Sequence, residues 1–373
     1  MAGLYLHIPF CRSRCIYCAF HSGTELDLRQ RYVDALCHEL HQRRGYLNGE
    51  KISTIYFGGG TPSLLTKADF QQIFDEISAN FLVDDGAEIT VECNPDDLSD
   101  EYVTDLASLP FNRVSMGVQS FDDEELCFLR RRHTARQAIE AVRRLQTAGF
   151  QNISIDLMFG LPMQTEAVWQ RTLQQATALG VQHISAYSLT YEGDTALVRL
   201  RNQHKIAEAD EELCLALFNQ TIDTLQQAGF EQYEISNFSL SGFRSRHNSS
   251  YWSGVPYLGV GAAAHSYNGT ERRWNVADTK RYIVGIENET PDFGSEVLTS
   301  DDRYNETVFT HLRTREGIDL QQLDEFYRNY CLRLAKPFID SGKLILSDNH
   351  LRLTRAGIFV SDGIASELFL VRS

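Results

Sequence analysis

The sequence lacks several features that would place the protein in a broad class at once. No apolar run approaches the roughly 20 residues that span a membrane, and residues 1–7 do not resemble the start of a secretory signal. Basic charge is not in excess, since Lys and Arg number 35 against 50 Asp and Glu, a net charge of -15. We therefore expect a cytoplasmic protein that binds no nucleic acid. Peripheral membrane contact and homodimer formation stay open.

The chain has enough length and apolar content for a large core. With 373 residues, of which 43% are hydrophobic, it can form one large domain and one small one. Short apolar runs alternate with longer amphipathic ones, and the pattern indicates strands at 4–8, 54–57, 88–92, 113–118, 153–158 and 183–188. Helices are expected between them at 28–44, 67–81, 100–108, 134–149 and 165–179. Such units imply parallel strands with right-handed crossovers, so we predict an α/β fold with a six-unit barrel or partial barrel.

The pattern changes in the last third of the chain. A helix at 208–228 is followed by residues 233–266, which are rich in aromatic residues, Gly, Asn and His and predict irregular structure around a site. From about Ser300 we expect helices at 320–330 and 331–340, a hairpin at 344–353 and a last helix, a small α+β module resembling a winged helix. Its charge is balanced, which argues against DNA binding. The predicted domains are 1–235 (barrel), 236–299 (connecting segment) and 300–373 (C-terminal domain).

Three cysteines near the N-terminus, Cys11, Cys15 and Cys18, have the spacing C-x3-C-x2-C. Thiolates are the usual ligands of iron–sulfur clusters, and a cubane normally takes four. Three on one loop leave one iron free for a small molecule, which predicts a reactive [4Fe-4S] cluster. Zinc sites usually show a second C-x2-C pair farther along the chain, which this sequence lacks. The remaining cysteines are interpreted as small buried apolar residues: Cys37, Cys93, Cys127, Cys214 and Cys331.

Chemically distinctive residues follow several of the expected strands. A Gly-Gly-Gly-Thr-Pro run occupies 58–62, and Glu92, Gln119 and Asp156 each end a strand. In parallel α/β folds the active site gathers at these strand ends. Glycines there allow a ligand to approach the backbone and its N–H groups closely. Together with an open cluster, the run indicates a ligand that chelates iron through an amino group and a carboxylate.

The cysteine loop, with Tyr17 just before the last cysteine, resembles that of the radical S-adenosylmethionine (SAM) enzymes. Residues 58–62 then resemble their contact with the methionine amine. The chain is similar over nearly its whole length to the oxygen-independent coproporphyrinogen III oxidases and their relatives. The segments that carry this likeness are YLHIPFC at 5–11, GGGTP at 58–62, ECNP at 92–95, GVQSF at 117–121, RRH at 131–133 and DLMFGLP at 156–162.

The resemblance implies a radical SAM partial (β/α)6 TIM-like barrel and a C-terminal domain of that family. It implies a [4Fe-4S] cluster on Cys11, Cys15 and Cys18, and SAM on its fourth iron. The SAM site would be lined by Tyr5, Tyr17, Gly59, Gly60, Thr61, Glu92, Gln119, Arg131 and Asp156. The acidic residues can accept hydrogen bonds from ribose or amine, and Arg131 can pair with the ligand carboxylate. The cofactor pair carries the hard chemistry, so no side chain is assigned a catalytic role.

A second constellation lies at 245–252, where the run His-Asn-x-x-Tyr-Trp resembles a signature of a haem-chaperone branch of this family. His247, Tyr251 and Trp252 are therefore the candidate haem-binding residues, because imidazole can bind iron and aromatic rings can cover a porphyrin. A lone histidine is also often structural. The sequence leaves open whether His247, His265 or a cysteine would bind the iron. By this resemblance the protein carries haem as cargo to respiratory membrane haemoproteins.

The alternative function is oxidative decarboxylation of coproporphyrinogen III. Two departures weigh against it: Phe20 occupies the place of a further cysteine in the oxidases, and Tyr5 has only four residues ahead of it, where they carry a long extension. Arg130 stands where the family usually has glycine. Whether the protein is an enzyme is left open by these observations.

Overall fold

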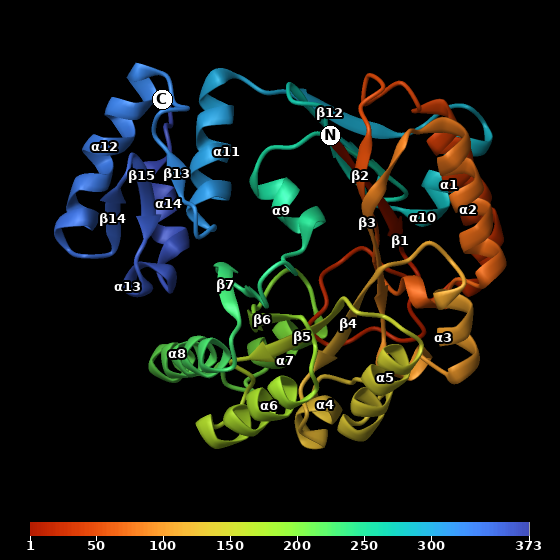
Figure 1. The fold of residues 1–373 in the computed structure, drawn as a ribbon, viewed down its shortest axis with the longest axis horizontal. Helices are drawn as coiled ribbons and strands as arrows, with labels where there is room; N and C mark the ends of the chain where they lie inside the picture. Colours follow the sequence, from red (N-terminus) through yellow and green to blue (C-terminus); the bar gives the residue numbers. More distant parts are fainter. Residues whose placement is uncertain (373) are drawn as a thin grey trace.

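The computed structural model describes residues 1–372, and its core is a mixed sheet of twelve strands (Figure 1). Six parallel strands form the middle of the sheet in sequence order. They are β1 (Ala2–Ile8), β2 (Ile52–Gly59), β3 (Val83–Cys93), β4 (Arg113–Gln119), β5 (Ile153–Phe159) and β6 (His183–Ser188). The six do not close on themselves, because further strands pair with β1 and β6. The predicted partial TIM-like barrel is confirmed.

Helices in the crossovers cover the outside of the parallel strands (Figure 1). They are α1 (Arg29–Gln42), α2 (Lys67–Asn80), α3 (Asp100–Ala107), α4 (Asp123–Phe128), α5 (Ala135–Thr147) and α6 (Glu166–Ala178). In α5, Thr134 and Gln137 form a capping box, which satisfies backbone donors that the first turn leaves free. Apolar side chains of α5 recur at helical spacing and are buried. Burial of each large one stabilises the fold by roughly 2 kcal/mol. The helix ends just before Gly149, whose φ of +97° suits the left-handed cap that the sequence indicates there.

The interior of the barrel is polar, although its outer layer is apolar. Side chains alternate along each strand, so every second residue points inward. Two short hydrogen-bond chains involve these residues. Ser154 and Tyr233 bond the two nitrogens of His183, at 2.7 and 2.8 Å. In the second chain, the Thr54 hydroxyl bonds one ring nitrogen of His247, Nδ1, at 2.8 Å.

Residues 233–266 correct one prediction, because in place of irregular structure they contain a helix and several short strands, and the segment 237–297 extends the main sheet. Strands β9 (Tyr257–Val260), β10 (His265–Tyr267), β11 (Glu271–Asn275) and β12 (Phe293–Val297) continue the sheet beyond β1. Beyond β6 lie β8 (Asn237–Ser239) and β7 (Glu231–Glu234). The remaining helices up to this point are α7 (Ala196–Asn202), α8 (Glu211–Gln227), α9 (Arg246–Trp252) and α10 (Thr279–Glu287). The added strands are only three to five residues long, too short for a clear alternation in the sequence.

The C-terminal region packs around its own apolar core. It contains α11 (Ser300–Leu312), β13 (Ile318–Asp319), α12 (Glu325–Asp340), β14 (Leu344–Ser347), β15 (His350–Leu353), α13 (Arg355–Ile358) and α14 (Ser361–Leu368). The predicted hairpin is present as β14 and β15. The two expected helices at 320–340 form one continuous helix, α12, which begins later than expected because the buried Leu320 bonds through its N–H to Asn349 of the hairpin. Helix α9 lies between β2 and α11, so it fills the space beside the C-terminal region (Figure 1).

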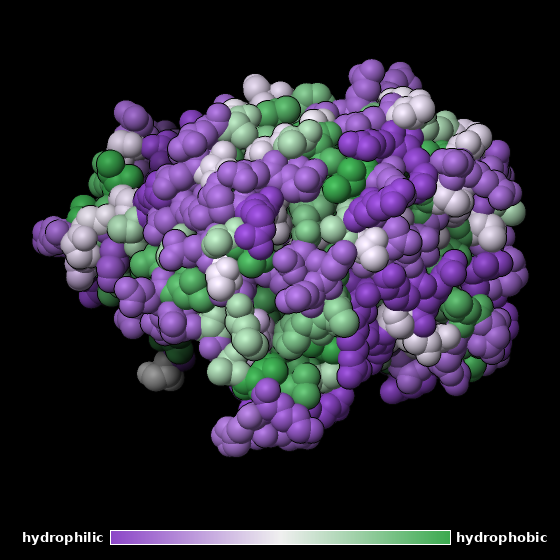
Figure 2. Space-filling view, turned by 90° about the horizontal axis from the view of Figure 1, so that it is seen from below, coloured by the Kyte–Doolittle hydropathy of each residue, from purple (hydrophilic) through white to green (hydrophobic). Residues whose placement is uncertain are grey.

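No helix within residues 1–372 is long and apolar enough to cross a bilayer. The face drawn in Figure 2 is mostly hydrophilic, with small groups of hydrophobic residues between the polar ones.

Candidate functional site

The cysteine loop follows β1 and is held at its start by backbone hydrogen bonds. Cys11 N–H donates to the Gly23 carbonyl at 2.8 Å, and Gly23 N–H donates to Pro9 at 2.7 Å. Cys11, Cys15 and Cys18 are free thiols of intermediate burial. All three therefore lie on one partly open loop, where they can reach a common ligand.

Two side-chain donors point at sulfur atoms of this loop. The Thr61 hydroxyl donates to Cys11 Sγ at 3.5 Å, and Arg131 Nη1 donates to Cys15 Sγ at 3.4 Å. Hydrogen bonds of this kind stabilise thiolates and tune the sulfur ligands of a cluster. Residues 1–372 contain no group of three or more His, Cys, Asp or Glu side chains placed closely enough to hold a single metal ion. Three thiolates on one loop are the donor type that iron–sulfur clusters use.

The glycine run at the end of β2 is required by close backbone packing. A Cβ on Gly60 would lie 2.8 Å from the carbonyl oxygens of Ile8 and Phe10, and one on Gly59 would lie 2.5 Å from the His7 ring. Gly59 also has a φ of +110°, which side-chain-bearing residues rarely adopt. The run therefore packs directly against the segment that leads into the cysteine loop.

Two buried carboxylates come from the parallel strands, Glu92 near the carboxyl end of β3 and Asp156 in the middle of β5. Glu92 accepts hydrogen bonds from the Tyr56 hydroxyl at 2.7 Å and from Gly59 N–H at 3.1 Å. Burial raises the pKa of Glu92 to about 7, with the charge of Asp156 adding to the rise. Burial likewise raises the pKa of Asp156 to about 6, opposed by the Ser185 hydroxyl. Both pKa values approach neutrality because charged carboxylates are costly to desolvate, a pattern typical of functional sites.

The β4 end is conformationally strained. Gln119 has a φ of +70°, an uncommon conformation for a residue with a side chain, and Arg130 has a φ of +55°. Glycine would adopt this left-handed backbone at position 130 without cost, which agrees with the glycine that the family resemblance implies there. Arg131 donates through Nη2 to Asn94 and to the Gly117 carbonyl, both at 2.6 Å. It is thus anchored beside Cys15, while its Nε has no partner within the described chain.

Two tyrosines expected in the SAM site flank the same region. The Tyr5 hydroxyl contacts His7 Nδ1 at 3.0 Å, and its ring stacks on Tyr56 at 6.3 Å between centroids. Tyr17 precedes the third cysteine, and burial raises its pKa. The cysteine loop, the glycine run and the ends of β3, β4 and β5 therefore all face one end of the barrel, as the strand-end rule predicts.

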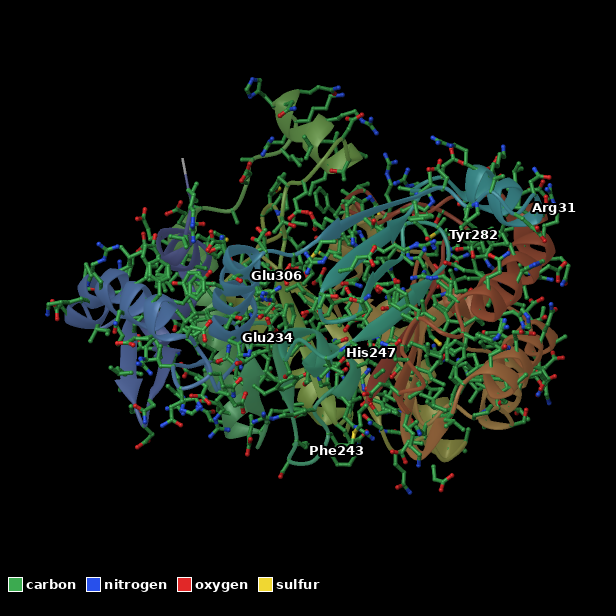
Figure 3. The ribbon with its side chains drawn as sticks, turned by 90° about the horizontal axis from the view of Figure 1, so that it is seen from above. Arg31, Glu234, Phe243, His247, Tyr282 and Glu306 are labelled. Carbon is green, nitrogen blue, oxygen red and sulfur yellow. The ribbon has the colours of Figure 1, made fainter. Side chains whose placement is uncertain are left out.

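His247 differs from the expectation of an iron ligand, because both of its ring nitrogens are engaged. Its Nδ1 bonds Thr54 at 2.8 Å and its Nε2 bonds the Tyr251 hydroxyl at 2.8 Å. The side chain is fully buried within the main domain (Figure 3), and burial lowers its pKa to about 3. Tyr251 and Trp252 line a cavity, whereas His247 lies behind them.

That cavity, of about 990 Å³, lies between the end of the cysteine loop, the strands added beside β1 and helix α11. Its volume is at the upper end of the range for small-molecule sites. Most of its lining is aromatic, imidazole or arginine, and it includes Tyr5, Phe20, His21, Tyr251, Trp252, Tyr257, His265, Tyr267, Arg272, Arg303, Phe309, His311 and Phe369. Most of these residues carry no motif in the sequence, and they come from elements distant in the chain.

The other cysteines follow the prediction only in part. Cys37, Cys93 and Cys331 are buried, whereas Cys214 is partly buried and Cys127 is exposed.

Comparison with known proteins covers both parts of the chain. Residues 5–176 match the Radical SAM superfamily, and residues 298–360 match the HemN C-terminal domain. The chain is 33% identical to the heme chaperone HemW of Mycobacterium tuberculosis, over 98% of this chain and 94% of that protein. It is 34% identical to the Bacillus subtilis protein of the same name, with 96% of each chain covered. Among solved structures, coproporphyrinogen III oxidase (HemN) from Escherichia coli superposes with a TM-score of 0.85, at 24% identity, over 98% and 89% of the two chains. That likeness shows a shared fold.

Proposed function

Because this chain belongs to the HemW family of radical SAM proteins, we propose that it is a cytoplasmic haem chaperone. It would bind haem together with a SAM-ligated [4Fe-4S] cluster and deliver the haem to respiratory haemoproteins at the membrane. The observation that carries this proposal is the large aromatic and imidazole-lined cavity that begins directly after the cysteine loop. A planar apolar macrocycle that bears carboxylates suits such a lining.

The proposed cofactor site uses the residues at the end of the barrel. Cys11, Cys15 and Cys18 would hold the cluster, and the glycine run, Glu92 and Asp156 would surround SAM. When bound, the cluster and SAM supply reductive cleavage of the sulfonium. The protein's own part is to orient the cofactor through fixed donors and acceptors and to exclude water from it.

Haem transfer tests this function. The anaerobically reconstituted chain, loaded with hemin, is mixed with membranes from haem-starved cells, and recovery of respiratory haem-enzyme activity is followed. Hemin-loaded serum albumin serves as the control for passive transfer. Faster recovery with the chain than with albumin is expected; equal recovery would contradict a chaperone role.

The oxidase fold neighbour supports one competing function, decarboxylation of coproporphyrinogen III. An anaerobic assay with SAM, a reductant and coproporphyrinogen separates the two. We expect no protoporphyrinogen, because Phe20 is 70% exposed in the cavity wall where the oxidases have a cysteine. Sustained formation of protoporphyrinogen would replace the chaperone proposal with an enzymatic one.

SAM affinity should fall on acidification through pH 7. The pKa of Glu92 is about 7, so its carboxylate is mostly charged at pH 8 and mostly protonated at pH 6. If only the carboxylate accepts hydrogen bonds from SAM, affinity drops about tenfold between these values. Anaerobic calorimetry on the reconstituted protein measures the change. Glu92→Gln should bind weakly at both pH values, whereas exposed Glu101→Gln should behave as wild type; the same tenfold drop in Glu92→Gln would exclude Glu92 as the titrating group.

A further inference from the structure

We infer that His265 on β10, and not His247, binds the haem iron, and that Arg303 on α11 binds a haem propionate. The inference rests on the proposed haem-binding function and deepens it, since it assigns the side chains that hold the cargo. It replaces the interpretation of the His-Asn-x-x-Tyr-Trp run as the source of the iron ligand.

The histidines around the cavity differ in what their ring nitrogens already do. His7 bonds Tyr5 through Nδ1 and the His21 carbonyl through Nε2, so neither nitrogen is free. His21 bonds Thr279 and His311 bonds Thr310, each through one nitrogen. Among the histidines lining this cavity, His265 is the one whose ring makes no hydrogen bond to any residue in 1–372. One free ring nitrogen is enough to bind iron, and His21 and His311 keep one each, whereas His265 can bind through either nitrogen without losing a hydrogen bond.

Strand alternation places His265 on the cavity side of the sheet. The next residue, Ser266, is fully buried, and its hydroxyl accepts a hydrogen bond from Gly259 N–H at 3.0 Å on the opposite side. Tyr267 pairs with Tyr257 of β9 and also lines the cavity. Directly opposed residues share a face, so these tyrosines and His265 form one wall. Partial burial lowers the pKa of His265, which keeps the imidazole neutral and able to ligate at neutral pH.

Helix α11 forms the facing wall and supplies a free cation. Arg303 donates to the Leu298 carbonyl at 2.8 Å and to the Ser300 hydroxyl at 3.1 Å, and no carboxylate within residues 1–372 pairs with it. Arg272 of β11 is already paired with Glu306 of α11 at 2.6 Å, and Figure 3 marks Glu306 at the edge of the C-terminal region. Arginine binds carboxylates through two parallel hydrogen bonds, so a propionate has an unneutralised partner in Arg303.

His247 has a different role, because its contacts lead to the cofactor end of the barrel. Its ring stacks on Tyr56 at 4.9 Å between centroids, and the Tyr56 hydroxyl donates to Glu92. It also lies close under Gly3, whose added Cβ would meet the ring at 3.5 Å. His247 is therefore a positioning residue: it holds Tyr56 in place by stacking and Tyr251 by a hydrogen bond.

Hemin titration of the full chain, followed by absorbance, tests the iron ligand. Wild type should give an imidazole-ligated spectrum. His265→Ala should lose it, with at least a tenfold weaker affinity, and added free imidazole should restore it. His247→Phe, which keeps the stacked ring, should retain the haem spectrum and instead weaken SAM binding. The exposed His38→Ala is the surface control, and thermal melting checks that each variant folds.

Arg303 is tested with a matched pair of ligands. Arg303→Gln should bind hemin about tenfold more weakly than wild type, whereas both should bind hemin dimethyl ester, which lacks the carboxylates, equally well. An equal loss with both ligands would overturn the propionate assignment.

The hemin titration distinguishes a failure of the His265 assignment from a failure of the proposed haem-binding function. Wild type that binds hemin while folded His265→Ala gives the same spectrum and affinity would overturn His265 as the ligand and leave the chaperone proposal standing. Wild type that binds no hemin would overturn both.

Discussion

Replacing Cys15 with serine should abolish assembly of a stable [4Fe-4S] cluster. Cys15 is one of three thiols on the loop, and the guanidinium of Arg131 already donates to its sulfur. A serine hydroxyl is a much poorer cluster ligand than a thiolate, and two remaining thiolates cannot hold a cubane against solvent. After anaerobic reconstitution, bound iron and sulfide should fall by about 90% or more relative to wild type. Iron and sulfide analysis with electron paramagnetic resonance measures the loss.

Cys127→Ser is the matched control for this experiment. Cys127 is an exposed, free thiol on α4. It should assemble as much cluster as wild type, with the same response to added SAM. A cluster of wild-type content in Cys15→Ser, or a metal analysis that returns zinc in the wild type, would remove the basis of the radical SAM interpretation.

Gly60→Ala should displace the cysteine loop and destabilise the fold by about 1–3 kcal/mol. Its added Cβ would lie 2.8 Å from two backbone carbonyls, those of Ile8 and Phe10, and 3.0 Å from Phe10 N. Backbone atoms cannot move aside as a flexible side chain can, so the segment that ends in Cys11 must shift. Cluster occupancy and SAM affinity should fall together with the thermal midpoint, as measured by reconstitution, calorimetry and melting.

Gly23→Ala provides the comparison, because Gly23 belongs to the same loop. Its N–H and carbonyl bond Pro9 and Cys11, yet a Cβ there would meet nothing within 4 Å. The alanine variant should keep wild-type cluster content and lose little stability. If both glycine variants behaved alike, loop flexibility rather than close packing would explain the requirement at Gly60.

The parallel core was readable from the sequence because its signals are local. The strands β1 to β6 and the helices between them carry apolar runs and caps within a few residues of each other, as at Thr134 and Gln137. Strands β9 to β12 were missed, since each is short and gains its stability by pairing with a distant segment, as β9 does with β1. Strands this short carry no clear periodic signal of their own.

The candidate cofactor residues could be named from the sequence because each belongs to a short motif within or just after a strand. In parallel α/β folds, residues near the carboxyl ends of the strands lie together at one end of the barrel, whatever the crossovers contain. The free imidazole of the cavity has no such signal in the sequence. The histidine in the most distinctive run, His247, has both nitrogens bonded inside the barrel, while the exposed His265 follows no motif. Which imidazole is free depends on its neighbours in space, and these come from segments far apart in the chain.

The sequence by itself determined the alternation of strands and helices, the three-thiol loop and the residues at the strand ends, because spacing along the chain decides each of them. Only the tertiary structure decided that residues 237–297 complete the sheet, that α11 faces β10 across a cavity, and which histidine there keeps its nitrogens free. The physical reason is that hydrogen-bond satisfaction and burial belong to the packed molecule. They arise when distant segments meet.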